Sequence, residues 1–335
     1  MGNTYQIGIV GGSGFVGSSI ARYLSKKFKV TIIDLKRPRI ELDKDMEYIN
    51  CDIRNYEEVK KALADLDLVI HAAIVQIPLI NEQKKLGYEV NILGTHNICK
   101  AVDENSQAKG LILAGSWHTI GERELRGIIN EEFGFRPDKV EDRARLYAIS
   151  KIAQECIVRY HDEISPKYFG ILRLGTVLGK GMSDKTAAGI FIERGLKGES
   201  ITPYKHSMHR PMLYVDIEDV CKAFEAFAQK ILNSDLKEKG NILESIVNVY
   251  FPRAVTILQL AKIVQKAIIK HSKGRIKPKI EIVETEQKLL FNENDWKQIK
   301  VDISKAVTIL GLRKLRSPEE VINDLIKEKL KEGVV

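Results

Sequence analysis

The sequence predicts an α/β protein, in which a doubly wound parallel sheet carries a smaller C-terminal α/β lobe. Three observations support this prediction: apolar and amphipathic segments alternate, a glycine-rich turn follows the first apolar segment, and this regularity ends near residue 178. Strands that alternate with helices along a chain usually pair in parallel, with helices covering both faces of the sheet.

The apolar segments have the length and composition of buried strands, and the segments between them have helical periodicity. After Gly14, the apolar residues Val16, Ile20 and Leu24 recur every four positions, so they share one helix face. The expected strands are 5–10, 29–34, 46–51, 67–73, 110–116 and 168–177, and the expected later helices are 57–66, 87–104 and 147–161.

The chain length of 335 residues favours one large domain with a smaller lobe. We expect the sheet domain to comprise 1–178, joined by 213–250. The smaller lobe would then comprise 179–212, which is rich in Gly, Lys and Ser, and 251–335. A strand is expected within this lobe at 279–284.

Composition and charge narrow the classes of partner. The net charge is +8, but it is spread along the chain and only 7% of residues are aromatic, which disfavours nucleic-acid binding. The four cysteines are far apart, so we expect neither a metal site nor disulfides. The first residues lack a signal-peptide pattern, and the longest apolar run is too short to span a bilayer. We therefore expect a cytoplasmic protein without a membrane partner.

The segment "GGSGFVG" follows the first expected strand and opens the first expected helix. Glycines at this point allow a tight turn and a close approach of the backbone to a pyrophosphate, and the helix N-terminus offers free N–H groups. A plain glycine turn is the alternative, but the strand and helix on either side favour a dinucleotide site in a Rossmann-type domain. Its predicted residues are Gly11, Gly14, Phe15, Val16 and Gly17.

Further candidates for cofactor binding stand at the ends of the next strands. Asp34 ends the second strand, where a carboxylate accepts hydrogen bonds from ribose hydroxyls and repels a 2′-phosphate, so NAD is favoured over NADP. The basic residues at 36 and 37 weaken that preference. Asp52 and Ile53 are placed to face an adenine, and Ala72 is small enough to let a cofactor lie close to the backbone.

Ser116, Tyr147 and Lys151 are the candidate catalytic residues. Ser116 ends the fifth strand, at the sheet edge where ligands bind. Tyr147 and Lys151 are four residues apart, so they share a helix face, and we expect the ammonium to lower the pKa of the phenol. The tyrosine could then act as a general base for a substrate hydroxyl that the serine orients.

With these motifs, the chain resembles the extended short-chain dehydrogenase/reductases, and more narrowly the NAD-dependent epimerase/dehydratase family. The resemblance extends over nearly the whole chain, through "GGSGFVGSSI", "YEVNILGTHNI", "GSWHTIG", "YAISK" and "HRPMLYVD". It implies that Asn91 lies near the cofactor and that Arg210 binds an anionic part of the substrate. It also implies a homodimer formed through helices 87–104 and 147–161.

Departures from the family pattern bear on the reaction. The Asp-Glu pair of 4,6-dehydratases is replaced by Trp117 and His118, which disfavours elimination. The residues Ser116-x-His118, with the later "LRLG", are instead similar to uronate dehydrogenases. Trp117 is expected to form a wall of the pocket, and His118 to be a substrate ligand, an acid or an ordinary loop histidine.

The resemblance thus implies an NAD-dependent epimerase of a nucleotide sugar, acting by hydride transfer through a keto-sugar. A net NAD-dependent dehydrogenase of a sugar, uronate or polyol is the alternative. The expected substrate-binding residues are Ser116, Trp117, His118, Tyr147 and Arg210. A protein that binds NAD without catalysis is a third reading, which the intact Ser, Tyr and Lys disfavour.

Overall fold

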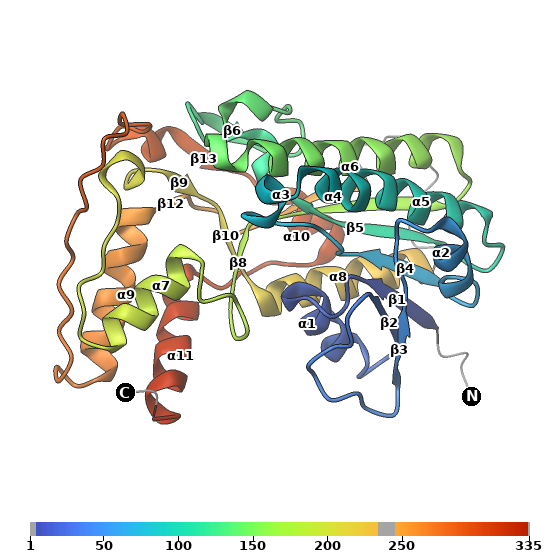
Figure 1. Cartoon of the computed structure of the whole chain (residues 1–335), viewed down its shortest axis with the longest axis horizontal. Coiled ribbons are helices and arrows are strands. Elements are labelled where there is room, and N and C mark those ends of the chain that lie inside the picture. Colours follow the sequence, from blue (N-terminus) through green and yellow to red (C-terminus); the bar gives the residue numbers. More distant parts are fainter. Residues whose placement is uncertain (1–4, 234–244, 334–335) are drawn as a thin grey trace.

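The computed structural model of the chain describes residues 5–233 and 245–333. Its centre is a parallel sheet of seven strands in the order β11-β7-β5-β4-β1-β2-β3 (Figure 1). The strands are β1 (Gln6–Val10), β2 (Lys29–Asp34), β3 (Met46–Asn50), β4 (Leu68–His71), β5 (Gly110–Ser116), β7 (Tyr168–Leu174) and β11 (Ile246–Val249). This confirms the predicted doubly wound sheet.

Helices cover both faces of this sheet (Figure 1). On one face α2 (Tyr56–Ala62) packs against α5 (Gly94–Glu104), which packs against the long α6 (Arg145–Ile164). On the other face α1 (Phe15–Leu24) packs against α8 (Ile217–Leu232). All seven residues of β5 are buried, as expected for a central strand with helices on both sides.

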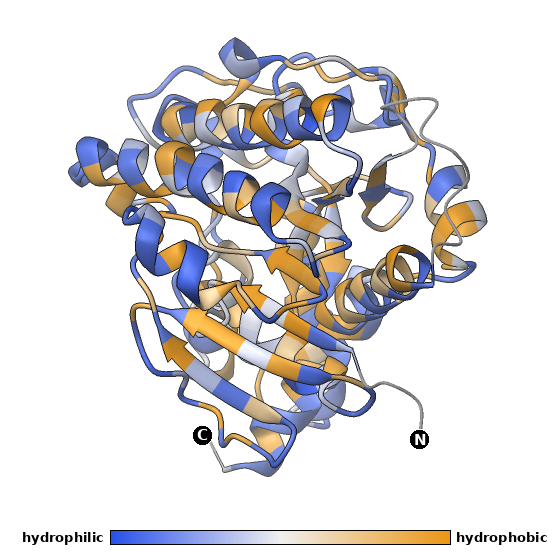
Figure 2. Ribbon diagram, turned by 90° about the vertical axis from the view of Figure 1, so that its right-hand side faces the viewer, coloured by the Kyte–Doolittle hydropathy of each residue, from blue (hydrophilic) through white to orange (hydrophobic). Residues whose placement is uncertain are grey.

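The sheet separates two apolar clusters, which explains the sequence pattern of the strands. Along β1, Ile7 and Ile9 belong to the cluster that contains α1 and α8, whereas Val10 belongs to the cluster that contains α2 and α5. Most strands of the sheet are therefore hydrophobic, while the helices alternate between hydrophobic and hydrophilic residues (Figure 2). Fully buried parallel strands are expected to read as continuous apolar runs.

Three helices form a second group at one end of the sheet (Figure 1). They are α7 (Ala187–Leu196), α9 (Ile257–His271) and α11 (Pro318–Lys331), and α9 packs against both others. The predicted division into a sheet domain and a lobe stays a prediction, and residues 1–4, 234–244 and 334–335 of those ranges lie outside the described residues. Within the range expected for the lobe, α10 (Ser304–Leu310) packs instead against α8 and β11 of the sheet domain.

Two expected strands differ in the structure. The segment 168–177 divides at Gly175 into β7 and β8 (Thr176–Leu178), because the chain leaves β11 and pairs with β10 (Tyr214–Asp216). The segment 279–284 forms only isolated bridges, at Ile280 and Val283. Pro203 in the facing segment has no N–H, so a continuous ladder cannot form there.

The expected helix 87–104 consists of three consecutive parts. These are α4 (Lys84–Tyr88), a π-helical turn η1 (Glu89–Leu93) and α5. A π-helical turn inside a helix frequently marks a functional site, and this one contains Asn91. Among the described residues, no helix is both long and apolar enough to cross a membrane.

Candidate active site

A cavity of about 520 Å³ lies at the carboxyl ends of the central strands. This is the edge of an open α/β sheet where ligands bind. The cavity is lined by every predicted site residue except Asn91 and Arg210: Gly11, Gly14, Phe15, Val16, Gly17, Asp34, Asp52, Ile53, Ala72, Ser116, Trp117, His118, Tyr147 and Lys151. Tertiary structure therefore brings together residues from six separate segments.

The glycine turn needs its glycines for different reasons. Gly11 has φ +80°, and a Cβ there would lie 2.4 Å from the backbone nitrogen of Ala73. A Cβ on Gly17 would lie 2.3 Å from the carbonyl oxygen of Gly11. Gly14 precedes α1 without a side-chain cap, so N–H groups of the first turn remain available to a ligand. This cradle fits the pyrophosphate of a dinucleotide.

Asp34 closes the turn from the neighbouring strand. Its Oδ2 accepts a hydrogen bond from the Ser13 backbone N–H at 3.1 Å, and its Oδ1 accepts one from the Lys36 N–H at 3.1 Å. Each carboxylate oxygen keeps a second lone pair for another donor. Asp34 also lines the cavity, so its position fits the acceptance of ribose hydroxyls.

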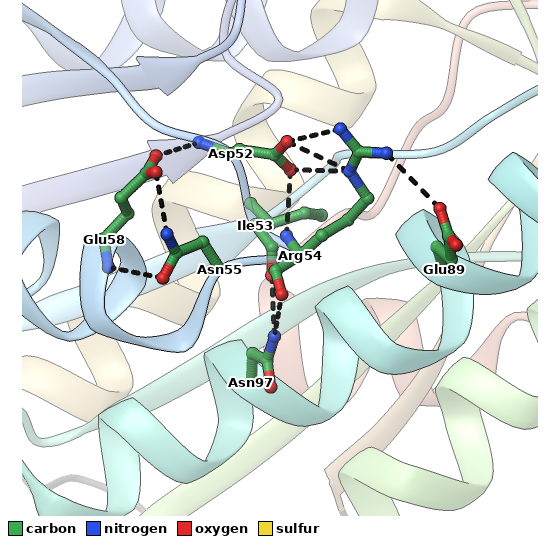
Figure 3. A network of polar contacts seen from close by, with 7 residues as sticks. All are labelled: Asp52, Ile53, Arg54, Asn55, Glu58, Glu89 and Asn97. Carbon is green, nitrogen blue, oxygen red and sulfur yellow. Dashed lines mark hydrogen bonds and ion pairs between the residues drawn. The ribbon is translucent and has the colours of Figure 1, made fainter.

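Asp52 lines the cavity and belongs to a charged network that includes Arg54 and Glu58 (Figure 3). Its backbone N–H donates to Glu58, and its carboxylate receives the Arg54 Nε at 2.9 and 3.0 Å. Arg54 also reaches Glu89 of η1, at 3.3 Å. The hydrogen bonds from Arg54 hold the pKa of Asp52 below its usual value, so the carboxylate is ionised at neutral pH. The sequence interpretation missed this arginine.

Ser116, Tyr147 and His118 form one corner of the cavity, the candidate catalytic corner. Ser116 ends β5, and its hydroxyl accepts the His118 backbone N–H at 3.2 Å and lies 3.3 Å from His118 Nδ1. The Ser116 hydroxyl acts on the pKa of Tyr147, so the two hydroxyl groups lie close together. The His118 ring meets the Tyr147 ring edge-on, with 5.5 Å between centroids. All three side chains line the cavity.

Burial governs the titration of this corner. It raises the pKa of Tyr147, with the Ser116 hydrogen bond acting in the opposite direction, and it lowers the pKa of Lys151 to about 7. The expectation that Lys151 lowers the phenol pKa is therefore wrong for this state. The Lys151 Nζ donates instead to the Ala114 carbonyl at 2.8 Å, and desolvation opposes charge on both groups.

The surroundings of Trp117 and His118 indicate which role each side chain can have. Trp117 is buried and lines the cavity, and its indole N–H donates to the Thr176 hydroxyl at 3.1 Å. Burial, together with Arg210 and Arg143, lowers the pKa of His118 to about 3. A histidine that is neutral at pH 7 suits a hydrogen-bonding role toward a substrate better than the role of an acid.

Asn91 does not line the cavity. Its side chain is fully buried and is hydrogen-bonded to both backbone groups of Val75, at 2.7 and 3.1 Å, and to Ser150 at 3.0 Å. Asn91 thus holds the loop after β4 beside helix α6. The neighbouring residues Ile74, Gln76 and Ile77 of this loop do line the cavity, so Asn91 is placed to position the wall.

Arg210 is also outside the cavity lining. Its Nη1 lies 2.5 Å from Glu141 Oε2, and both side chains are nearly buried. Other basic groups of the small lobe have partners as well: Lys180 with Glu328, Lys205 with Glu284, and His206 with Thr285. The role of Arg210 in binding an anionic part of the substrate stays a prediction, and in this structure the guanidinium pairs with Glu141.

Other residues of the cavity wall were missed from the sequence. Thr176, Met182, Ser183 and Thr186 line it after β7, and Gly115 lines it at the end of β5. The rule that loops after parallel strands form the site would have indicated these positions, but no motif marks them. Among the described residues, no group of three His, Cys, Asp or Glu could hold a metal ion.

Comparison with curated proteins gives two relatives that bear on the reaction. Over 268 residues, the chain is 33% identical to a UDP-glucose 4-epimerase from Rickettsia bellii, covering 72% of this chain and 70% of the relative. Over 235 residues it is 25% identical to a UDP-N-acetylglucosamine 4,6-dehydratase (inverting) from Campylobacter jejuni, covering 66% and 63%. A short-chain dehydrogenase/reductase of family 42E from Danio rerio is matched over only 31% of its length.

Solved structures share the fold over almost the whole chain. The UDP-glucose 4-epimerase of Thermotoga maritima, solved with UDP-glucose, has a TM-score of 0.78 at 19% identity and covers 98% of this chain and 100% of its own. The UDP-glucuronic acid 4-epimerase of Bacillus cereus, solved with UDP-glucuronic acid and NAD, has a TM-score of 0.74 at 22% identity and covers 96% and 99%. At these identities the likeness establishes the fold.

The family follows from the sequence match. Residues 7–242 match the NAD dependent epimerase/dehydratase family, which is well over half of the chain. The glycine cradle, Asp34, Ser116, Tyr147 and Lys151 all line one cavity, and this arrangement fits a bound dinucleotide beside Tyr147. The chain is therefore an enzyme of the extended short-chain dehydrogenase/reductase type that uses NAD, and it belongs to the NAD-dependent epimerase/dehydratase family.

Proposed function

We propose that the protein is an NAD-dependent epimerase that inverts one carbon of a nucleotide sugar. The observation that carries this proposal is the convergence of Ser116, Tyr147 and Lys151 on one cavity beside the glycine cradle. The relative from Rickettsia bellii and the solved epimerases support the substrate class. Trp117 and His118 stand where an elimination would need carboxyl groups, which disfavours a dehydratase.

In this mechanism, Tyr147 takes the proton from a sugar hydroxyl and Ser116 holds the same oxygen. Lys151 would hold the ribose next to the nicotinamide once NAD lies in the cavity. NAD held by the glycine cradle and Asp34 would supply the hydride acceptor and, in its reduced form, the hydride donor that inversion of the carbon needs. His118 is neutral and lies edge-on to Tyr147, so it would donate a hydrogen bond to the sugar or accept one from it.

A net NAD-dependent dehydrogenase of a sugar or uronate is the second candidate. Two observations favour it: His118 lines the cavity next to Ser116, and Arg210 is paired with Glu141 instead of facing the cavity. A dehydrogenase would release its oxidised product and the reduced cofactor, whereas an epimerase keeps both until the hydride returns.

Turnover of the purified protein separates these candidates. The protein with excess NAD would be mixed with UDP-, GDP- and dTDP-sugars and with free uronates, while absorbance at the reduced-nicotinamide band is followed and products are identified by NMR. An inverted sugar without lasting NADH supports the epimerase. Stoichiometric NADH with an oxidised sugar rejects it in favour of the dehydrogenase.

We also propose that the protein is a homodimer that pairs through α4–α5 and α6. These helices expose large apolar side chains on the outside of the sheet domain: Tyr88, Leu93, Ile149, Tyr160 and Ile164. Exposed apolar clusters of this kind often mark an interface. Sedimentation equilibrium giving a monomer at micromolar concentration would reject this assembly.

A further inference from the structure

Glu141 occupies the space between two arginines next to the catalytic corner. Its Oε2 lies 2.5 Å from Arg210 Nη1 and 2.7 Å from Arg143 Nε. The side chain of Glu141 is 7% exposed and that of Arg210 is 11% exposed. Burial raises the pKa of Glu141, but the arginines outweigh it and hold the pKa below its ordinary value. Glu141 is thus a buried anion that two arginines hold, with the Glu122 carboxylate also close to Arg210.

The fit between this carboxylate and its arginines is incomplete. The Oε2 atom of Glu141 pairs with both arginines, while its Oε1 atom has no hydrogen-bond partner among the described residues. The Nε of Arg210 is likewise buried without a partner in that part of the chain. An arginine–carboxylate pair is strongest when two parallel N–H groups meet two oxygens. A group that offers more acceptor oxygens would satisfy Arg210 better.

The pair lies next to the groups that would handle the sugar. Arg210, Arg143 and Glu141 all act on the pKa of His118, so their charges are close to its ring. His118 lines the cavity and contacts Tyr147 edge-on. Glu141 precedes Tyr147 by only six residues, in the extended turn that leads into α6. An anion bound at Arg210 would therefore sit beside the reacting sugar.

We infer that Glu141 is a displaceable stand-in for the anionic group of the substrate and that it sets the affinity for that group. This inference rests on the proposed function. An anionic substrate exchanges places with the Glu141 carboxylate, and its oxygens then take up the free Arg210 donor. The shared chemistry is an anion with at least two acceptor oxygens, which either a diphosphate or a uronate carboxylate supplies.

The Glu141 side chain can move away from Arg210 without unfolding the turn that contains it. Its backbone N–H is held by the Glu122 carboxylate at 3.0 Å, independently of its side chain. Rotation of the side chain would move the carboxylate toward Arg143, which is the more exposed of its two partners. Every anionic ligand must separate Glu141 from Arg210 before it binds. Glu141 therefore lowers the affinity for anions and restricts binding to ligands that can replace its carboxylate.

The test compares Glu141→Gln with wild type in the full-length protein with NAD present. Calorimetry would measure binding of two probes, UDP and free glucuronate. Glutamine keeps the size but removes the competing charge, so the dissociation constant of one probe is expected to fall about tenfold. A gain confined to UDP assigns the site to a diphosphate, and a gain confined to glucuronate assigns it to a carboxylate. An unchanged or weaker constant for both probes overturns the inference.

Further variants serve as controls for this test. Asp142→Asn removes the same charge one residue away, where the carboxylate is exposed and pairs with Arg145 and Arg123, so its constants should equal those of wild type. Adding Arg210→Gln to Glu141→Gln should abolish the gain. If Glu141→Gln does not fold, Glu141→Asp shortens the reach to Arg210 and should give a smaller gain in the same direction, and no gain again overturns the inference.

The proposed function and this inference fail in different measurements. Wild-type protein that converts no nucleotide sugar or uronate rejects the proposed function, whatever Glu141 does. Wild-type protein that converts its substrate, with a Glu141→Gln variant whose binding and KM are unchanged, rejects only the inference.

Discussion

The two ends of the cavity are built on different principles. At the cofactor end, backbone carries the site: the Gly11 turn, the free N–H groups of α1, and Asp34 held by two backbone donors. At the candidate catalytic end, side chains form the site, and desolvation displaces the pKa values of Tyr147, Lys151 and His118. We therefore expect cofactor binding to depend on close approach of the backbone and the chemistry to depend on desolvation.

The largest effect is expected from Tyr147→Phe, which removes only the phenol oxygen at the catalytic end. We expect turnover to fall at least about a hundredfold, because a positioned general base contributes that much, while NAD binding changes little. Steady-state kinetics and calorimetry with NAD would measure both. Tyr204→Phe, at an exposed tyrosine outside the cavity lining, is the control. Near-normal turnover in Tyr147→Phe would exclude the mechanism.

Gly11→Ala tests the cofactor end. The substitution places a Cβ 2.4 Å from Ala73 N at φ +80°, so we expect a loss of about 2 kcal/mol or more in unfolding free energy, together with loss of NAD binding. Thermal melts and NAD titration would show it. Gly134→Ala, where no atom lies within 4 Å of the new Cβ, should behave like wild type. Normal NAD binding in Gly11→Ala would mean that the turn is not the cradle we describe.

Asp34→Ala should change which dinucleotide is bound. Without the carboxylate, the ribose hydroxyls lose an acceptor and a 2′-phosphate is no longer repelled. The dissociation constant for NAD is expected to rise about tenfold, and the preference for NAD over NADP should shrink, by fluorescence titration of both. An unchanged preference would mean that Lys36 and Arg37, and not Asp34, set the selectivity.

Lys151→Met should make the NAD-free protein more stable, although it destroys activity. The pKa of Lys151 in the folded protein is about 7, below its ordinary 10.5. Below pH 7 the buried ammonium is charged, and its desolvation then destabilises the folded protein to the full extent. That cost disappears as the pH rises from 7 to 10.5, because the unfolded chain then binds more protons. We expect the free energy of unfolding of Lys151→Met to exceed that of wild type by about 1 kcal/mol at pH 6.5, and this difference to shrink toward pH 10. Denaturant titrations at both pH values test it, with the surface variant Lys197→Met as control, and a loss of stability at pH 6.5 would contradict it.

The smallest effect is expected at the adenine end of the cavity. Arg54→Met frees Asp52 and breaks the link to Glu89 (Figure 3). Because this network is half-exposed, we expect the NAD dissociation constant to rise only about threefold. Lys61→Met, an exposed residue of α2, is the control. A change above thirtyfold would mean that Arg54 contacts the cofactor directly.

Features that depend on local geometry could be predicted from the sequence. The glycine spacing between a strand and a helix predicted the turn, since only glycine adopts φ +80° at Gly11 without strain. The periodicity predicted the strands and helices of the sheet domain, and the four-residue spacing predicted that Tyr147 and Lys151 share a face. These signals depend on neighbours in the chain.

Features that depend on residues far apart in the chain could not be predicted, because they arise from the way the chain folds. The tertiary structure paired Arg210 with Glu141 across 69 positions, turned Asn91 toward Val75 and Ser150, and buried Lys151 deeply enough to lower its pKa. A sequence motif names a charged side chain but does not state which opposite charge will face it or how much water it will lose. Those two quantities set the electrostatics of the site, and for this protein they are properties of the fold.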